Sequence, residues 1–151
     1  MPKIDVIDEA VIDSPPRVVY KAILNEYAGV THWWMPHFGF KLRGDMPTLH
    51  EGAIVDITAN PKSRINAKFS AKITKIVEAK SWVEELTGDF VGTGEWTLEP
   101  TDGKTKVHSR WNVRTNKLLF SIFSPFVSME KRHSDTMQKG FKALNSYLSK
   151  K

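Results

Sequence analysis

The sequence contains no cysteine and no long apolar run. The absence of cysteine excludes disulfide bonds, thiolate metal sites and a cysteine nucleophile. No apolar segment approaches the roughly 20 residues that a membrane-spanning helix needs. The first ten residues, "MPKIDVIDEA", include acidic residues where a secretory signal peptide has an apolar core. We therefore expect a cytoplasmic protein without stable insertion in a membrane.

Sequence motifs typical of metal, phosphate or serine-nucleophile chemistry are also missing. His32 and His37 are five residues apart without a carboxylate at helical ligand spacing, and Glu130 and His133 form only an isolated pair. The glycine-rich segment "GDFVGTG" lies between predicted strands and opens no helix, so it cannot present a helix N-terminus to phosphate. No Gly-x-Ser-x-Gly motif occurs. We expect no metal and no cofactor.

The basic residues do not follow a nucleic-acid-binding pattern. The net charge of +5 is spread along the chain apart from the terminal lysines and one basic strand. The outer face of that strand carries Lys62, Arg64, Lys68 and Lys72. Phe69 belongs to the opposite face, so no exposed aromatic ring is interleaved with the basic side chains. A solvated sheet face is the simpler interpretation, and we expect no nucleic-acid partner.

The overall composition is that of one globular domain. The chain has 151 residues, of which 40% are hydrophobic and 26% are charged. A chain of this length can bury most of its surface in a single core. Because neither an internal repeat nor a linker is present, we predict one domain over residues 1–151.

Hydrophobic periodicity predicts a strand followed by a helix at the start of the chain. From Ile4 to Ile12 the even positions are mostly apolar, which is the alternation of a half-buried strand. Ser14 is then a candidate N-cap and Pro15 a candidate first helical residue. The apolar spacing that follows predicts a helix of about three turns.

A second short helix is predicted directly after the first. Val30, Trp33 and Trp34 are separated by three and four residues, so in a helix they would share one face. Pro36 would end this helix. We therefore expect two short helices between the first strand and the rest of the sheet.

Alternating apolar residues predict six further strands. Their ranges are 37–43, 53–59, 64–78, 81–87, 93–99 and 105–115, with turn signals at Asn60-Pro61, Gly88-Asp89 and Asp102-Gly103. Connections this short join antiparallel neighbours, because parallel neighbours need crossovers of about a dozen residues or more. The prediction is an antiparallel meander.

The C-terminal segment returns to helical periodicity. Ser124 and Pro125 repeat the start signal of the first helix. One apolar face then contains Phe126, Met129, His133, Met137, Gly140, Phe141, Leu144 and Leu148. A helix over 125–149 would be about 37 Å long and could cross the concave face of a twisted sheet.

This order of elements resembles the helix-grip (SRPBCC) superfamily, which includes START lipid-transfer domains, birch pollen allergen relatives and polyketide cyclases. The resemblance rests on "VIDSPPRVVYKAI", "HWWMP", "GTGEWTLEPTDGKTKV" and "KRHSDTMQKGFKALNSYL". It is strongest to the polyketide cyclase/dehydratase group, which often shows Trp-Trp-Pro and a final helix of the type His-x-x-x-Met-x-x-Gly. Met35 interrupts the first motif here. The implied fold is α+β, with a seven-stranded antiparallel sheet wrapped around a long C-terminal helix and two short helices after the first strand.

The resemblance implies a cavity between the sheet and the C-terminal helix that holds an apolar small molecule. The predicted ligand-binding residues are Trp33, Trp34, Trp82, Glu84, Trp96, Ser109, Trp111, His133, Met137 and Gly140. Large apolar side chains with a few polar groups are typical of such pockets. For the tryptophan pair three roles stay open: a wall of the ligand entrance, a simple lid on the sheet, or a membrane-interface contact.

Two residues are candidates for acid/base or ligand-orienting roles. His133 lies on the apolar face of the last helix, although a core histidine satisfied by a backbone carbonyl or a tyrosine is the more common situation. Glu84 alternates with Trp82 and Leu86 and would point inward, unless an edge position or a bulge turns it outward. Gly140 on the inner helix face indicates close packing or space left for a ligand.

Three functions remain open from the sequence. The first is a carrier or sensor that encloses a hydrophobic, lipid- or polyketide-like molecule. The second is an enzyme of the cyclase/dehydratase type with His133 or Glu84 as the acid/base group. The third, a chaperone cofactor or nucleic-acid module acting through its surface, fits the charge but explains neither the tryptophans nor Gly140. The sequence specifies neither the ligand nor the oligomeric state.

Overall fold

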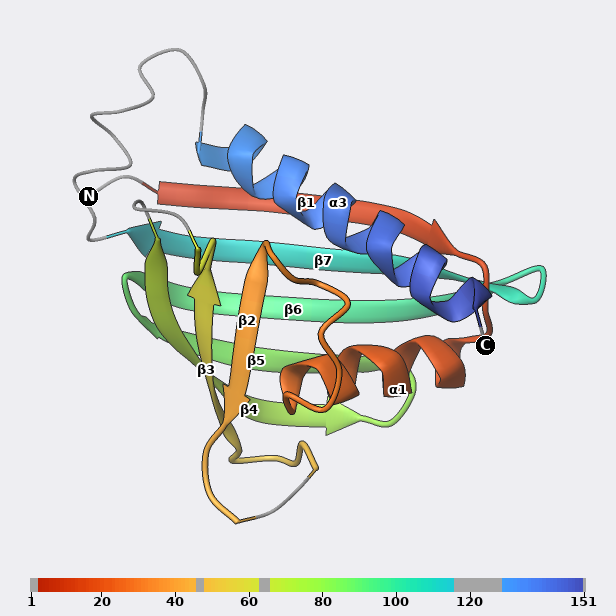
Figure 1. Ribbon diagram of the computed structural model, residues 1–151, viewed down its shortest axis with the longest axis horizontal. Coiled ribbons are helices and arrows are strands. Elements are labelled where there is room, and N and C mark those ends of the chain that lie inside the picture. The colour runs from red at the N-terminus through yellow and green to blue at the C-terminus, as the bar shows by residue number, and fades with distance from the viewer. Residues whose placement is uncertain (1–2, 46–47, 63–65, 116–128, 151) are drawn as a thin grey trace.

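The computed structural model describes residues 3–45, 48–62, 66–115 and 129–150. Seven strands and two helices are present in this part of the chain (Figure 1). The elements are β1 (Lys3–Ile12), α1 (Pro16–Tyr27), β2 (Phe38–Leu42), β3 (Ile54–Ala59), β4 (Ala67–Val77), β5 (Ser81–Gly88), β6 (Phe90–Thr101), β7 (Lys104–Thr115) and α3 (Met129–Ser149). The predicted α+β class and seven-stranded sheet are confirmed.

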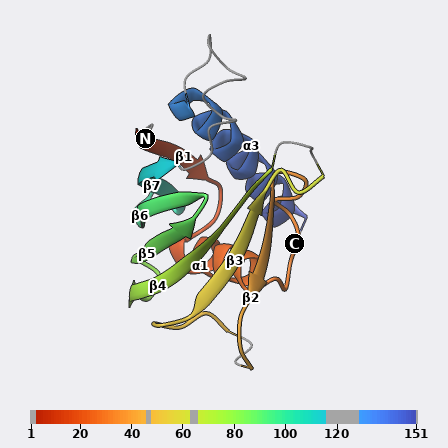
Figure 2. The same ribbon diagram turned by 90° about the vertical axis from the view of Figure 1, so that its left-hand side faces the viewer.

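All seven strands form one antiparallel sheet. The order is β1-β7-β6-β5-β4-β3-β2, so β1 and β7 are the one adjacent pair that is not consecutive in sequence. The sheet curls strongly, and β2 and β3 run steeply across the direction of β6 and β7 (Figures 1 and 2). This curl creates a concave face, and α1 and α3 lie on that side.

The register of β1 follows its side-chain alternation. Ile4 and Ile12 are buried on the concave face, as the even-position pattern predicts. Asp8 has the same parity and is also buried, with 4% of its surface exposed. A carboxylate is thus directed into the core beside β7, where Ser109 is its register partner.

Helix α1 begins differently from the prediction. Pro15 is the N-cap and Pro16 is the first helical residue, because the Pro15 carbonyl accepts the first intrahelical hydrogen bonds. The Ser14 hydroxyl donates to the carbonyl of Asp13 instead of capping the helix. The predicted Ser14 cap is therefore wrong by one residue, although proline at N1 is confirmed one position later.

The second short helix is absent. Residues 33–37 form turns between α1 and β2, and the Met35–Pro36 peptide bond is cis. Val30 is 63% exposed and does not share a buried face with the tryptophans. The backbone N–H groups of Trp33 and Trp34 donate to the buried carboxylate of Glu26. A side chain of α1 thus accepts hydrogen bonds from the N–H groups of this segment. The helix predicted from the spacing of Val30, Trp33 and Trp34 is therefore wrong.

The predicted strands and turns agree closely with the structure. Asp102 and Gly103, with φ values of 48° and 77°, form the two-residue turn between β6 and β7. The predicted 64–78 strand is β4, although residues 64 and 65 lie outside the described part of the chain. Its pairing with β5 shifts between Ile73 and Lys75, and the buried alternation holds up to this bulge.

Helix α3 runs beside the free edge of β1 (Figure 1). The predicted helix over 125–149 is confirmed from Met129, whereas Ser124, Pro125 and Phe126 lie outside the described residues. The amide of Asn145 donates to the Val11 carbonyl at 3.1 Å and accepts from the Asp13 N–H at 2.8 Å. Two polar groups of the β1 edge are thereby satisfied by a helix side chain in place of another strand.

Candidate functional site

Two adjoining pockets lie between the concave sheet face and the helices. The inner pocket is lined by Tyr27, Trp34, Phe38, Phe40, Ile57, Phe69, Glu84, Trp96, Ser109, Trp111, His133 and Met137. The outer pocket is lined by Ile4, Phe38, Ala59, Asn60, Ala67, Phe90, Trp111, Met129, Arg132, His133 and Thr136. Phe38, Trp111 and His133 belong to both and separate them. The site is therefore two pockets divided by three side chains.

Both pockets are small in the structure. The space open to the centres of water molecules is about 30 Å³ in the inner pocket and about 90 Å³ in the outer one. One water needs about 10 to 15 Å³ counted in this way, so the inner pocket has room for about two or three waters. The cavity is narrower than the guest-sized space that the resemblance implies.

The indole of Trp34 accounts for part of this closure. A Cβ atom added at Gly140 would lie 2.1 Å from Trp34 Nε1. Glycine therefore allows α3 to approach the indole closely, and the space beside Gly140 is filled by Trp34. Trp33 stacks on the ring of Trp34, with centroids 5.3 Å apart, and its indole N–H donates to the Ala22 carbonyl. The Trp34 indole is thus packed between the α3 backbone at Gly140 and the ring of Trp33.

Substituting Gly140 with alanine is expected to destabilise the protein by about 1 to 2 kcal/mol. Overpacking against a fixed ring costs about 1 to 3 kcal/mol, and the better helix propensity of alanine returns up to about 1 kcal/mol. Chemical denaturation of the wild type and the variant measures the difference.

A Trp34→Ala background provides the control for this prediction. Without the indole, Gly140→Ala should stabilise the protein by up to about 1 kcal/mol, because only the helix-propensity gain remains. Lys139→Ala on the exposed face of α3 should change stability by less than about 0.5 kcal/mol in both backgrounds. Equal effects of Gly140→Ala in both backgrounds would contradict the proposed contact.

Glu84 projects from β5 into the inner pocket. Its side chain is buried, which excludes the edge and outward-bulge alternatives. The Tyr27 hydroxyl donates to Oε1 at 3.2 Å, and Oε2 has no hydrogen-bond partner among the described residues. Gly94 on β6 makes room for this carboxyl group, since a Cβ there would lie 2.8 Å from Oε1. Burial raises the pKa of Glu84 to about 7, against the lowering effect of hydrogen bonds from Tyr27 and Trp96.

His133 and Asp8 form a buried pair on the other side of the inner pocket. The distance from His133 Nδ1 to Asp8 Oδ2 is 3.2 Å, and the two side chains are 8% and 4% exposed. The imidazole also stacks on Trp111, with ring centroids 4.1 Å apart. Burial acts to raise the pKa of Asp8, but hydrogen bonds from His133 and Ser134 and the charge of His133 hold it below its usual value. His133 is therefore satisfied by a carboxylate instead of the expected backbone carbonyl or tyrosine.

Solved structures with the same arrangement identify the fold. A START superfamily protein from Mycobacterium smegmatis matches with a TM-score of 0.72 at 14% identity, over 97% of each chain. Ara h 8.0201 matches with a TM-score of 0.68 at 17% identity, over 99% of this chain and all of that one. The chain has the helix-grip fold. A protein from Chromobacterium violaceum shares this helix-grip fold with a TM-score of 0.67 at 16% identity, over 95% of each chain.

Sequence comparison alone does not reach these helix-grip proteins. No protein-family model matches the chain, and no curated protein sequence matches it. At identities below 20% the matches establish the helix-grip fold alone. Function must therefore be argued from the side chains of the site.

The helix-grip fold brings most of the predicted site residues together. The inner pocket is lined by Trp34, Glu84, Trp96, Ser109, Trp111, His133 and Met137. Trp33, Trp82 and Gly140 line neither pocket. Trp82 stacks on the ring of Trp96 at 5.2 Å, and Trp33 stacks on Trp34 and Tyr147. Any role of these three in ligand binding is indirect, through the residues that they support.

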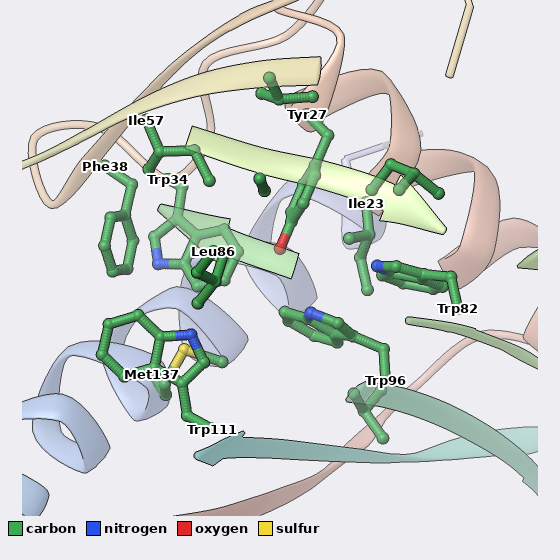
Figure 3. Close-up of a cluster of buried hydrophobic side chains, with 14 of the residues drawn as sticks. Ile23, Tyr27, Trp34, Phe38, Ile57, Trp82, Leu86, Trp96, Trp111 and Met137 are labelled. Atoms are coloured by element: carbon green, nitrogen blue, oxygen red, sulfur yellow. The ribbon is translucent and has the colours of Figure 1, made fainter. Parts of the chain in front are cut away.

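Several pocket residues were not predicted. The missed lining residues are Tyr27, Phe38, Phe40, Ile57 and Phe69, and Asp8 was missed as the partner of His133. Asp8 was visible in principle, because it shares the even parity of Ile4 and Ile12 on β1. Tyr27, at the end of α1, gave no comparable signal because its contact with Glu84 spans 57 residues. Figure 3 shows Tyr27 reaching toward Trp96, with Trp34, Trp111 and Met137 on the side of α3.

Membrane-spanning helices and metal-ligand clusters are both absent from the described part of the helix-grip chain. Among the described residues, no helix combines the length and apolarity that crossing a membrane requires. Within the same residues, no three His, Asp or Glu side chains are grouped as metal ligands. The polar side chains at the inner pocket include the Glu84–Tyr27 and His133–Asp8 pairs and Ser109.

Proposed function

We propose that the protein binds an apolar small molecule in the inner pocket, oriented by one polar group at its base. The observation that carries this proposal is the buried oxygen Glu84 Oε2, which has no partner among the described residues and lies in a pocket walled by aromatic rings. A buried polar group without a partner costs free energy, and a ligand that supplies the partner recovers it. Apolar walls with a few polar groups are typical of ligand pockets.

Binding requires that the inner and outer pockets join. Typical ligand pockets measure about 300 to 1,000 Å³, far more than either closed pocket here. Movement of Phe38 and Trp111, two of the three shared side chains, would connect them along the side of α3. The ligand would then select an open form over the closed one described here.

The neutral fluorescent probe N-phenyl-1-naphthylamine tests the proposed function. We expect saturable binding with a fluorescence increase, and a rise in Tm as the probe concentration increases. Ser109→Leu, which fills the inner pocket, should weaken probe binding by about tenfold or more. Thr93→Leu adds the same side chain to the exposed face of β6 and serves as the control. Equal binding by both variants would place the probe outside the pocket and contradict the proposal.

A second candidate function is an enzyme of the cyclase/dehydratase type. It is favoured by the position of Glu84 and His133 in one pocket, because general acid/base catalysis needs a group that titrates near neutral pH. Glu84→Gln and His133→Ala separate the two functions for any ligand that the wild type recognises. A carrier should show modest changes in affinity, whereas an enzyme should lose turnover in one variant and still bind.

A further inference from the structure

The inner pocket has an electrostatic character that suits a positively charged guest. Its wall presents the rings of Tyr27, Trp34, Trp96 and Trp111 among others, and the face of an aromatic ring attracts cations. No lysine or arginine is among the described residues that line it, and the charge of His133 is balanced by its partner Asp8. Glu84 supplies a carboxyl group at the base of this aromatic wall.

The hydrogen-bonding groups of the inner pocket also favour a positively charged guest. The Tyr27 hydroxyl already donates to Glu84 Oε1, and Trp96 also donates to this carboxyl group. The side chain of His133 is engaged with Asp8. Among the described residues, the buried side-chain atoms without a hydrogen-bond partner are Trp34 Nε1, Trp82 Nε1 and Glu84 Oε2. Trp34 Nε1 lies against Gly140 of α3 and Trp82 lines neither pocket, so the group available to a guest is the acceptor Glu84 Oε2. A guest with a carboxylate would place a second negative charge beside the buried Glu84, which is unfavourable.

We propose that the guest carries a protonated amine, whose N–H group donates to Glu84 Oε2 while its charge lies against the aromatic rings. The inference rests on the proposed function and names the chemical class of its ligand as an apolar amine. Charge-assisted hydrogen bonds of this kind are about twice as strong as neutral ones. A cation near a desolvated aromatic ring gains further attraction.

This pairing makes amine binding dependent on pH. The carboxyl of Glu84, with a pKa of about 7 in the free protein, must lose its proton to bind a cation. Affinity should therefore fall about tenfold for each pH unit below 7 and change little between pH 7.5 and 8.5. The other titratable groups at the pocket are Tyr27 on α1, Asp8 on β1 and His133 on α3. Glu84→Gln identifies which part of the pH dependence belongs to Glu84.

Three compounds with one ring and different head groups test the inference. We would measure binding of 2-phenylethylamine, 2-phenylethanol and phenylacetate by ligand-observed NMR at pH 7.5. The amine is expected to bind at least about tenfold more tightly than the other two. Glu84→Gln should remove this preference, because a neutral amide cannot pair with the ammonium group. Glu85→Gln, the exposed neighbour on the opposite face of β5, should keep it.

The outcomes separate this inference from the proposed function. If the alcohol or the carboxylate binds as tightly as the amine, or if Glu84→Gln keeps the preference, the amine inference is wrong while the pocket remains a binding site. If N-phenyl-1-naphthylamine binds and none of the three compounds does, the amine inference is likewise overturned. If neither that probe nor any of the three binds, the proposed function itself fails.

Discussion

Glu26→Ala is expected to lower the free energy of unfolding by about 3 to 5 kcal/mol and to release the turn that holds Trp34. The Glu26 carboxylate is 1% exposed and accepts three hydrogen bonds. Its donors are the Thr31 hydroxyl at 2.8 Å, the Trp33 N–H at 3.1 Å and the Trp34 N–H at 2.8 Å. Alanine would leave these groups without their acceptor.

The magnitude follows from the burial of the donors. A buried backbone N–H left without a partner costs about 1 to 3 kcal/mol, and the donors affected here are the buried Trp34 N–H and the part-buried Trp33 N–H. Burial raises the pKa of Glu26, whereas the hydrogen bonds from Trp34, Thr31 and Trp33 lower it. Burying the Glu26 carboxylate therefore costs free energy, and its hydrogen bonds stabilise the turn that contains Trp33 and Trp34.

Urea denaturation and near-ultraviolet circular dichroism check this prediction together. Thr31→Val removes one donor and leaves both backbone hydrogen bonds, so its cost should be about 1 kcal/mol. Glu26→Ala should also lose the near-ultraviolet signal of the stacked Trp33 and Trp34 rings, whose planes are 12° apart. If Glu26→Ala were as stable as Thr31→Val, the proposal that the Glu26 carboxylate holds the turn would be contradicted.

The same carboxylate shows where sequence reasoning reached its limit. The spacing of Val30, Trp33 and Trp34 fits a helix, and nothing within the segment argues against one before Pro36. Glu26 lies in the preceding helix and provides acceptors for the N–H groups of Trp33 and Trp34. Local periodicity cannot detect a competitor that is seven or eight residues away and buried, because its effect depends on tertiary packing.

Strand parity was the more reliable guide. The alternation in β5 and β7 correctly directed Glu84 and Ser109 inward, because a side chain's face follows from its position alone. The same rule applied to β1 would have revealed Asp8, a charged residue among apolar ones. The size of the pocket, in contrast, depends on how the Trp34 ring packs on Gly140. That packing is set by the position of α3 and could not be read from the pattern of either segment.

The second large effect concerns the stability of the protein as a function of pH. Burial raises the pKa of Glu84 from 4.5 to about 7 in the folded protein. Between these two values the folded state retains a proton that the unfolded state releases, so stability falls as the pH rises. One pKa unit corresponds to about 1.36 kcal/mol, and Glu84 alone should therefore cost about 3 kcal/mol between pH 4.5 and pH 8.

Glu84→Gln should remove this loss, because glutamine stays neutral at every pH. The variant's advantage over the wild type should grow by about 3 kcal/mol between pH 4.5 and pH 8, or roughly 6 to 12 °C in Tm. Asp8 and Glu26 are present in both proteins, so their titration cancels in the difference. Glu85→Gln, exposed on the same strand, should follow the wild-type curve. A difference between wild type and Glu84→Gln that stays constant across this range would mean that Glu84 is already charged in the folded protein at low pH. The carboxyl group would then be solvated, and the buried aromatic pocket on which its binding role depends would not exist.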